Sequence, residues 1–271
     1  MKLNHKFALL LAGAVLAGSL TGCGASGTPA SSAASSEAVS SAAAAELTTV
    51  EAGKLTMATN ATFPPYEMTT DSGEIEGIDV DTAKAIAEKL GLELQIDDME
   101  FDAALLSVQQ GKADIVMAGV TVTDERKAVM DFSDSYATGI QSIIVPNDSD
   151  IASPDDLAGK KIGTQRGTTG YIYCSDDFGE DSVVAYDSGL TAVQALNNGQ
   201  VDAVVIDNAP ATEYVAANPG LKVLDTSYAE EDYAIGMAKG SALEDAVNKA
   251  LEELKADGTL QAIVDKYINA N

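Results

Sequence analysis

Strand-like and helix-like segments alternate along most of this chain, and no other feature restricts its fold as strongly. In the first half, the pattern predicts strands at residues 54–60, 92–99 and 113–119, separated by helices at residues 78–91 and 101–111. Both helical segments end at a glycine, a residue that favours helix termination. Alternation of this kind predicts parallel sheets covered by helices.

The second half of the chain echoes the first. Residues 199–207 (GQVDAVVID) align with residues 111–119 (GKADIVMAG), and each segment follows a helix-type stretch with its apolar residues in register. Each segment also places an aspartate after a turn and before a buried strand. The similarity is one of secondary structure more than of residue identity, and it predicts two lobes of similar plan.

Two extended apolar runs, residues 139–146 and 232–240, flank the second unit and are predicted to cross between the lobes. Lobe 1 would then contain residues 54–139 plus 238–271, and lobe 2 would contain residues 140–237. The predicted fold class is α/β, with two parallel-rich sheets, flanking helices and a two-strand hinge. Such a hinge allows the lobes to close on a ligand.

The N-terminal residues predict export. Residues 1–22 begin with lysines, continue as a short apolar run and end with small residues, as a signal peptide does. Residues 20–23 (LTGC) resemble a bacterial lipobox, in which Cys23 becomes the lipid-bearing, palmitate-carrying first residue; the alternative is an ordinary secretory signal with an incidental cysteine. Residues 23–53 are largely Ser/Ala-rich and are predicted to form a flexible tether. We therefore expect a lipid-anchored protein at the extracytoplasmic face of a bacterial cell membrane.

Composition argues against several classes of function. The formal net charge of −26 disfavours nucleic-acid binding. His5 is the only histidine and would leave with the signal peptide, which removes histidine-based catalysis and most zinc sites. The two cysteines are Cys23 and Cys174, so we expect no disulfide, and Cys174 is predicted to be a buried structural thiol. We expect neither a metal nor a cofactor.

Candidate ligand-binding residues follow the predicted strands, at the strand ends where parallel sheets bind ligands. Ala118, Gly119 and Thr121 fall at the mouth of lobe 1, and Asp207 falls at the mouth of lobe 2. Arg126 comes soon after Thr121 and offers a planar fork of donors suited to a carboxylate. Alternatively, Arg126 is a solvated residue on the first turn of a helix.

A second anion-favouring position lies at residues 165–170 (QRGTTG), which follow a strand and open a helix. Asp207 is a natural counter-ion for an ammonium group, or alternatively caps the helix that begins after it. A cation and free N–H groups that face one anion match the charge pattern of an α-amino acid. Phe63 and Phe101 lie near the same strand ends, where two rings either hold an aliphatic side chain or pack into the core.

Several segments resemble the polar amino acid-binding lipoproteins of ABC importers. They include ATFPPYE (61–67), GVTVTDERK (119–127), GTQRGTTG (163–170) and GQVDAVVIDNA (199–209), and the resemblance covers nearly all of residues 54–268. It implies a two-lobed periplasmic-binding-protein fold of the second type. The partners it implies are a free amino acid and an ABC permease in the membrane, and we expect a monomer that binds no nucleic acid.

The resemblance also implies roles for individual residues. The positions that hold the α-carboxylate are Arg126, Gly119, Thr121 and Thr169. The ammonium position is Asp207, with a backbone oxygen near Ala118. The ligand side chain lies between Phe63 and Phe101, with Asn60 and Gln165 nearby.

The nature of the ligand side chain depends on three residues. Asn60 lies where relatives that take basic amino acids, and some that take glutamine, carry an aspartate, so arginine or lysine would lack a buried counter-charge. Gln165 is neutral, and Arg166 is expected to be solvated; if it pointed into the cleft, it would favour an acidic side chain. We therefore hypothesise an uncharged polar ligand such as glutamine.

Two other functions compete with import. Some proteins of this fold dehydrate prephenate or arogenate with a cleft carboxylate, a role for which Glu67 and Asp207 are the candidates here. The lipobox and the full carboxylate–ammonium set argue against such an enzyme. A ligand-sensing subunit for a membrane receptor would use the same closure as an import subunit, so the sequence does not separate these two.

Overall fold

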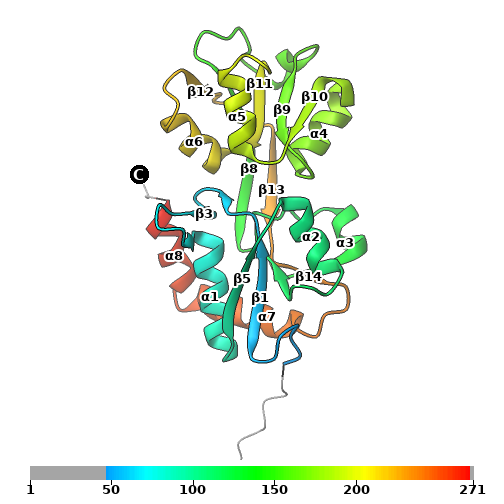
Figure 1. The fold of residues 1–271 in the computed structure, drawn as a ribbon, viewed down its shortest axis with the longest axis vertical. Coiled ribbons are helices and arrows are strands. Elements are labelled where there is room, and N and C mark those ends of the chain that lie inside the picture. Colours follow the sequence, from blue (N-terminus) through cyan, green and yellow to red (C-terminus); the bar gives the residue numbers. More distant parts are fainter. Residues whose placement is uncertain (1–46, 269–271) are drawn as a thin grey trace, which may run out of the picture. The chain divides into compact units, whose positions relative to one another are not determined.

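The computed structural model describes residues 47–268. The predicted signal peptide (residues 1–22), Cys23 and the first part of the predicted tether lie outside the described residues. Among the residues that are described, no helix is long and apolar enough to span a membrane. The chain from β1 onward forms two lobes that are joined by two extended strands (Figure 1).

Lobe 1 is built on a five-stranded sheet in the order β5-β1-β6-β14-β7. Its strands are β1 (Lys54–Thr59), β5 (Glu93–Asp98), β6 (Ile115–Val116), β7 (Met130–Phe132) and β14 (Gly236–Ala238). Its helices are α1 (Ile78–Leu90), α2 (Phe101–Gln109), α3 (Asp124–Val129), α7 (Glu244–Ala256) and α8 (Thr259–Tyr267). Side chains of β1 alternate between two cores, because Leu55 and Met57 pack with α1, α7 and α8 while Ala58 packs with α2. The sheet is therefore covered by helices on both faces.

Lobe 2 contains a six-stranded sheet in the order β10-β9-β11-β8-β12, with β13 also paired to β8. Its strands are β8 (Ala137–Pro146), β9 (Ile162–Gln165), β10 (Val183–Tyr186), β11 (Ala203–Asp207), β12 (Leu221–Val223) and β13 (Ala229–Tyr233). Its helices are α4 (Thr169–Phe178), α5 (Gly189–Asn197) and α6 (Asn208–Ala216), with short 3-10 turns η1 (Pro154–Leu157) and η2 (Glu180–Ser182).

The echo between the two halves of the sequence appears as a structural repeat. Helix α2 and strand β6 in lobe 1 correspond to helix α5 and strand β11 in lobe 2. Gly111 and Gly199 turn the chain after these helices with φ angles of 65° and 66°, which favour glycine. The aspartate after each turn then accepts a backbone N–H 2.8 Å away, Asp114 from Thr56 and Asp202 from Lys161. The same local device thus places the buried strand in each lobe.

Both sheets are mixed, with parallel strands as predicted and antiparallel strands beside them. Strands β1, β5 and β6 pair in parallel, as do β9, β10 and β11. The strands that run to or from the hinge pair antiparallel with their neighbours, for example β8 with β11 and β14 with β6. These strands pass directly from one lobe to the other, so no helical crossover forces them to be parallel.

The hinge consists of β8 and β13, which pair antiparallel from Ala137↔Tyr233 to Gln141↔Ala229. After β13 the chain returns to lobe 1 by Ala234, whose N–H donates to the carbonyl of Val120 at 3.1 Å. Strand β14 then joins the lobe 1 sheet. Residues 234–237 therefore belong to lobe 1, whereas the sequence interpretation placed them in lobe 2.

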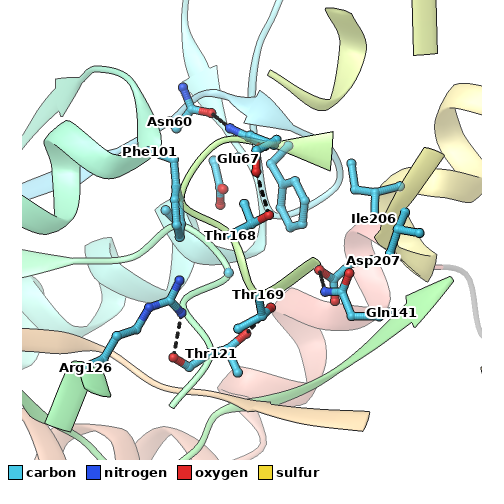
Figure 2. Close-up of a pocket in the computed structure, with 15 residues that line it drawn as sticks. Asn60, Glu67, Phe101, Thr121, Arg126, Gln141, Thr168, Thr169, Ile206 and Asp207 are labelled. Atoms are coloured by element: carbon cyan, nitrogen blue, oxygen red, sulfur yellow. Dashed lines mark hydrogen bonds between the residues drawn. The ribbon is translucent and has the colours of Figure 1, made fainter. Parts of the chain in front are cut away.

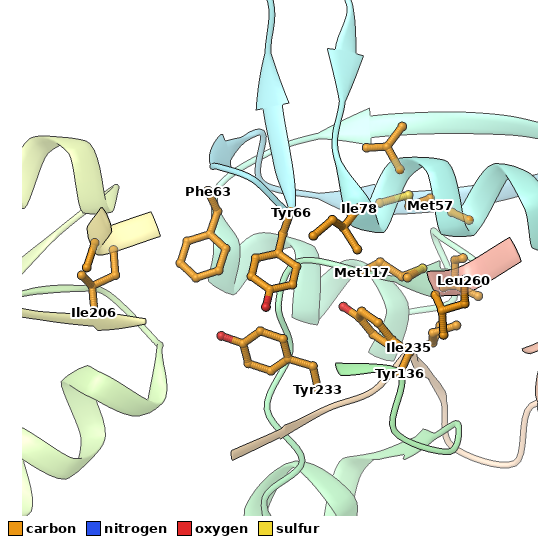
Figure 3. Close-up of a cluster of buried hydrophobic side chains, with 14 of the residues drawn as sticks. Met57, Phe63, Tyr66, Ile78, Met117, Tyr136, Ile206, Tyr233, Ile235 and Leu260 are labelled. Atoms are coloured by element: carbon orange, nitrogen blue, oxygen red, sulfur yellow. The ribbon is translucent and has the colours of Figure 1, made fainter. Parts of the chain in front are cut away.

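A third, small sheet packs against lobe 1 and was not predicted. Its strands are β2 (Thr62–Phe63), β3 (Glu67–Thr69) and β4 (Ile75–Glu76), so Phe63 lies on a strand and not in the expected loop. Phe63 stacks on Tyr66 with ring centroids 5.8 Å apart, and Tyr66 meets the edge of Tyr233 at 5.3 Å. Figure 3 shows this row of rings between the lobe 1 core and Ile206 of lobe 2. The row joins the small sheet to the hinge.

Candidate functional site

A pocket lies between the lobes, at the carboxyl ends of their strands. It is lined by lobe 1 residues from Asn60 to Arg126 and by lobe 2 residues from Gln165 to Asp207, together with Gln141 of the hinge (Figure 2). All residues predicted to contact a ligand lie along it: Asn60, Phe63, Phe101, Ala118, Gly119, Thr121, Arg126, Gln165, Thr169 and Asp207. The structure thus brings the predicted set together.

Arg126 is buried in this pocket, at 8% exposure, and is not the solvated helical residue of the alternative interpretation. Thr123 caps α3 and so fixes the start of the helix that carries Arg126. The guanidinium donates to the carbonyl of Thr121 at 2.7 Å and to the carbonyl of Gly167, in lobe 2, at 3.1 Å. It also lies 5.4 Å from the ring centroid of Phe101. Burial lowers the pKa of Arg126, but a guanidinium keeps its charge at any physiological pH.

Two threonines from opposite lobes meet beside Arg126. The hydroxyls of Thr121 and Thr169 are 3.4 Å apart, and Thr169 begins α4 directly after its cap, Thr168. The bonds on either side of Thr121 join Val122 N–H to Asp232 and Ala234 N–H to Val120. The N–H of Thr121 therefore points away from the returning hinge segment, toward the side on which its own carbonyl meets Arg126. Guanidinium, helix N-terminus and free N–H converge on a place suited to an anion.

Asp207 ends β11 and stands at the cap position of α6, but its side chain makes no capping bond. One carboxylate oxygen accepts a hydrogen bond from Gln141 at 2.7 Å. The other oxygen is buried and has no hydrogen-bond partner among residues 47–268. Burial, above all, raises the pKa of Asp207 to about 7. A carboxylate held in this way gains from an arriving ammonium group, so the geometry favours the counter-ion over the helix cap.

Sequence reasoning missed two hinge residues that organise the site. Gln141 on β8 donates from one amide nitrogen to both Asp207 and Glu231, at 2.7 and 2.9 Å. Glu231 on β13 also accepts from the hydroxyl of Thr121 at 3.2 Å. Gln141 is a polar residue inside the apolar run 139–146, and this position could have indicated a role in the site. Glu231 gave no such signal, because it sits in an acidic run that resembles solvated surface.

Gly119 contributes space and not a donor. Its N–H donates to Asp79 at 3.0 Å, so this N–H is not free for a carboxylate, contrary to the role that the resemblance implied. Its φ is +56°, and a Cβ there would lie 2.8 Å from the Phe63 ring. Both constraints require glycine next to the aromatic wall of the pocket.

The polar residues predicted for the ligand side chain bond to each other across the lobes. Gln165 donates to Asn60 at 2.9 Å, and the Asn60 amide donates to the carbonyl of Met99 at 2.9 Å. Arg166 is exposed and lies 3.7 Å from Asp187, so it is the solvated residue that was expected. The remaining ionisable group in this part of the pocket is Glu67, which is fully buried.

Cys174 is buried in α4, as predicted. Burial raises the pKa of its thiol to about 12, so the reactive thiolate is scarce at neutral pH.

Comparison with known proteins identifies relatives over almost the whole described region. Residues 55–270 match the sequence profile of the bacterial extracellular solute-binding proteins, family 3. The L-cystine-binding protein TcyJ of Escherichia coli (strain K12) is 33% identical over 82% of this chain and 85% of its own. Among solved structures, an ancestral arginine-binding protein bound to arginine is 43% identical, with a TM-score of 0.76 over 80% of this chain and 99% of that one. An ancestral arginine-binding protein bound to glutamine is 42% identical, with a TM-score of 0.75 over 80% of this chain and 98% of that one.

Proposed function

Because this chain belongs to the bacterial extracellular solute-binding proteins of family 3, we propose that it captures a polar α-amino acid between its lobes. It then delivers this amino acid to the membrane permease of an ABC importer. Relatives that bind cystine, arginine, histidine or glutamine support an amino-acid ligand.

The observation that carries the proposal is the opposition of Arg126 and Asp207. Arg126, the N–H of Thr121 and the start of α4 at Thr169 would hold the α-carboxylate. Asp207, whose second oxygen has no partner among the described residues, would hold the ammonium group together with the carbonyl of Ala118. These groups recognise what all α-amino acids share, and they come from both lobes, so only a closed cleft presents them together.

The ligand would therefore act by stabilising closure about the β8–β13 hinge. Contacts across the cleft already join the lobes at Arg126–Gly167, Asn60–Gln165 and Tyr214–Thr62. A ligand that bridges Arg126 and Asp207 adds to these contacts and shifts the open–closed equilibrium. The closed form would be the one that docks on the permease.

We further propose roles for the residues that precede the two lobes. Residues 1–22 would direct export, Cys23 would carry a lipid, and the tether that follows would hold a monomeric binding protein near its permease. The tether would end earlier than the predicted residue 53, because Leu47 packs against the core and the Val50 N–H donates to Asp114 of lobe 1 at 2.7 Å. A dehydratase or a receptor subunit finds no support among the relatives named above, which are binding proteins of transport systems.

Thermal unfolding against all twenty amino acids tests the proposal, after the protein has been unfolded and refolded to remove any carried ligand. A ligand at ~100 times its Kd stabilises the folded state by roughly 2.7 kcal/mol, which raises the midpoint visibly. We expect one or a few amino acids to do so, and their N-acetyl and α-carboxamide derivatives to fail because each lacks one of the two charges. A panel without any stabilising amino acid would contradict the function.

A further inference from the structure

Glu67 is a buried acid at the side-chain end of the pocket. We propose that Glu67, with Asp79 behind it, is a proton-exchanging selectivity site: it keeps its proton beside a neutral ligand side chain and releases it when a cationic one binds. This inference rests on the proposed capture of an amino acid and names the ligand chemistry that the pocket accepts. It differs from the glutamine-type ligand expected from Asn60 alone, because both neutral and cationic side chains would enter.

The position of Glu67 is the first argument. It begins β3, lines the pocket and has no exposed surface. No donor among residues 47–268 bonds to either of its oxygens, and the polar group beside it is the carboxyl of Asp79, another acid. A shared proton can join the two acids, but it leaves Glu67 with an unmatched oxygen; unmatched polar groups at full burial are costly, so Glu67 gains from a partner that arrives later. A ligand in the pocket is such a partner.

The side chain of a bound amino acid would extend toward Glu67. In Figure 2, Arg126, Thr121 and Thr169 lie at one end of the pocket, and Asn60 and Glu67 lie at the other. An amino acid whose carboxylate faces Arg126 extends its side chain toward the second end. Asn60 and Gln165 are already bonded to each other there. Glu67 is thus the ionisable group left to meet the tip of the side chain.

Glu67 and Asp79 differ in the hydrogen-bond donors that surround their carboxyl groups. One oxygen of Asp79 accepts from the N–H of Gly119 at 3.0 Å and from the hydroxyl of Tyr136 at 2.8 Å. These donors stabilise the Asp79 anion, whereas Glu67 has no donor at all in the described structure. Burial raises the pKa of Asp79 to about 6, and burial together with the Asp79 charge raises that of Glu67 well above its ordinary value. Two buried acids side by side do not both ionise, so the proton resides on Glu67.

Within the described part of the chain, no cation lies beside Glu67 to replace this proton. The charged groups that act on it are Asp79 from α1, Asp98 from the end of β5 and Asp207 from the end of β11. Glu67 in turn acts on the hydroxyls of three tyrosines, namely Tyr66, Tyr136 and Tyr214. These phenols stay neutral below pH 10. A positively charged ligand side chain would therefore be the first cation to face the pair.

The proton balance is simple. A neutral side chain accepts a hydrogen bond from the carboxylic acid of Glu67, and no proton leaves. A guanidinium or ammonium side chain pairs with the Glu67 carboxylate, and the acid proton passes to solvent. Binding of a cationic amino acid should then release about one proton more than binding of a neutral amino acid of the same shape.

L-arginine and L-citrulline form the matched ligand pair, because citrulline replaces the guanidinium by a neutral ureido group. Isothermal titration calorimetry at pH 7 in buffers of different ionisation enthalpy counts the protons that each ligand releases. Asp207 contributes equally to both, since both carry the same ammonium group. We expect a difference of about one proton, and an arginine-to-citrulline affinity ratio that rises up to about tenfold per pH unit between pH 6 and 8. Equal proton release, or a ratio independent of pH, would overturn the inference.

Substitution of Glu67 supplies a second test. Glu67→Gln keeps the shape but cannot ionise, so the arginine-to-citrulline ratio should fall at least about tenfold at pH 8 and lose its pH dependence. Glu74→Gln, on the exposed turn before β4, removes the same charge and should leave the ratio as in the wild type. A ratio unchanged in Glu67→Gln contradicts the proposal. If other amino acids bind the wild-type protein and neither arginine nor citrulline does, this inference fails while the proposed function stands.

Discussion

The two ends of the pocket are built in different ways. At the Arg126 end, the protein's own groups hold one another in place: Arg126 donates to two carbonyls, and Gln141 bridges Asp207 and Glu231. At the Glu67 end, one pair of amides is bonded across the lobes, while Glu67 has no hydrogen-bond partner among the described residues. The first end is preorganised and the second keeps an unmatched acid.

This difference teaches how one scaffold separates affinity from selectivity. Every α-amino acid carries the same carboxylate and ammonium groups, so a fixed arrangement of donors and acceptors serves all of them at low reorganisation cost. The side chain is the variable part, and an acid that can be neutral or charged accommodates more than one kind. A substitution at the Arg126 end should therefore lower the affinity for all ligands alike. A substitution at the Glu67 end should change only the ratio of the affinities for different ligands.

The largest effect is expected from Arg126→Ala. This change leaves the ligand carboxylate without its cation and removes the positive charge that faces Glu231, so binding should weaken by about 3 kcal/mol or more, over a hundredfold. Titration calorimetry with the best ligand of the amino-acid panel measures the loss. Lys127→Ala removes an exposed cation from the same helix and serves as the control. Binding in Arg126→Ala close to that of the control would show that this end does not hold the carboxylate.

Arg126 and Asp207 were found from the sequence because their placement depends on strand order. Residues that follow parallel strands come to the same edge of a sheet, so a cation after one strand and an anion after another are predicted to face a common cleft. The interlobe echo and the ends of α1 and α2 followed from apolar periodicity and glycine for a similar reason. Local patterns contain this information.

The rest of the site depends on contacts that no local pattern encodes. Whether Glu231 points inward depends on the register in which β13 pairs with β8, and the Gly119 N–H is taken up by Asp79 only after α1 has packed. Glu67 was considered only as a catalytic acid, because its position looked like an ordinary loop. The return of the chain to lobe 1 at Ala234 was placed too late for the same reason: β14 is an extended apolar run like the hinge strand before it.

The stability of the ligand-free protein should depend on pH in a direction set by both ends. The pKa values of Asp79, about 6, and Asp207, about 7, are raised above the ordinary aspartate value, as is that of Glu67. The native state keeps these protons where the unfolded state has lost them, so their stabilisation is complete below about pH 4 and is lost as pH rises toward 7. We expect the free energy of unfolding to fall by a few kcal/mol across this window, as measured by urea denaturation at constant ionic strength.

The variant Asp207→Asn distinguishes the contributions of the two ends to the pH dependence of stability. The variant should lose the part of the pH dependence that extends to about pH 7 and keep the part due to Asp79 and Glu67. The difference between wild type and variant also cancels the general repulsion of a very acidic chain. Parallel stability curves for the two proteins would mean that Asp207 is ionised throughout, and its assignment to the ammonium position would lose its electrostatic basis.

Gly139→Ala should disturb the Arg126 end without removing any polar group. A Cβ at this hinge position would lie 2.6 Å from an oxygen of Asp207 and 2.6 Å from the Tyr233 ring, so one of them must move. Crowding of this kind costs about 1 to 3 kcal/mol, and we expect arginine and citrulline to bind about tenfold more weakly, with their ratio kept. Gly220→Ala, where a Cβ meets nothing within 4 Å, is the matched control. A change in the ratio in place of a common loss would contradict the separation of the two ends.

The smallest effect is expected from Tyr214→Phe, which touches neither end of the pocket. The Tyr214 hydroxyl on α6 donates to the carbonyl of Thr62 on β2, so the bond forms between lobes and exists only when the cleft is closed. Its loss should cost about 1 kcal/mol of closure and weaken every ligand about fivefold, because closure and binding are coupled. Tyr171→Phe, whose hydroxyl makes no hydrogen bond within residues 47–268, is the control, and titration calorimetry compares the two. A loss confined to arginine or to citrulline would tie Tyr214 to the Glu67 end; an equal loss would show that closure is energetically independent of the side chain that the pocket selects.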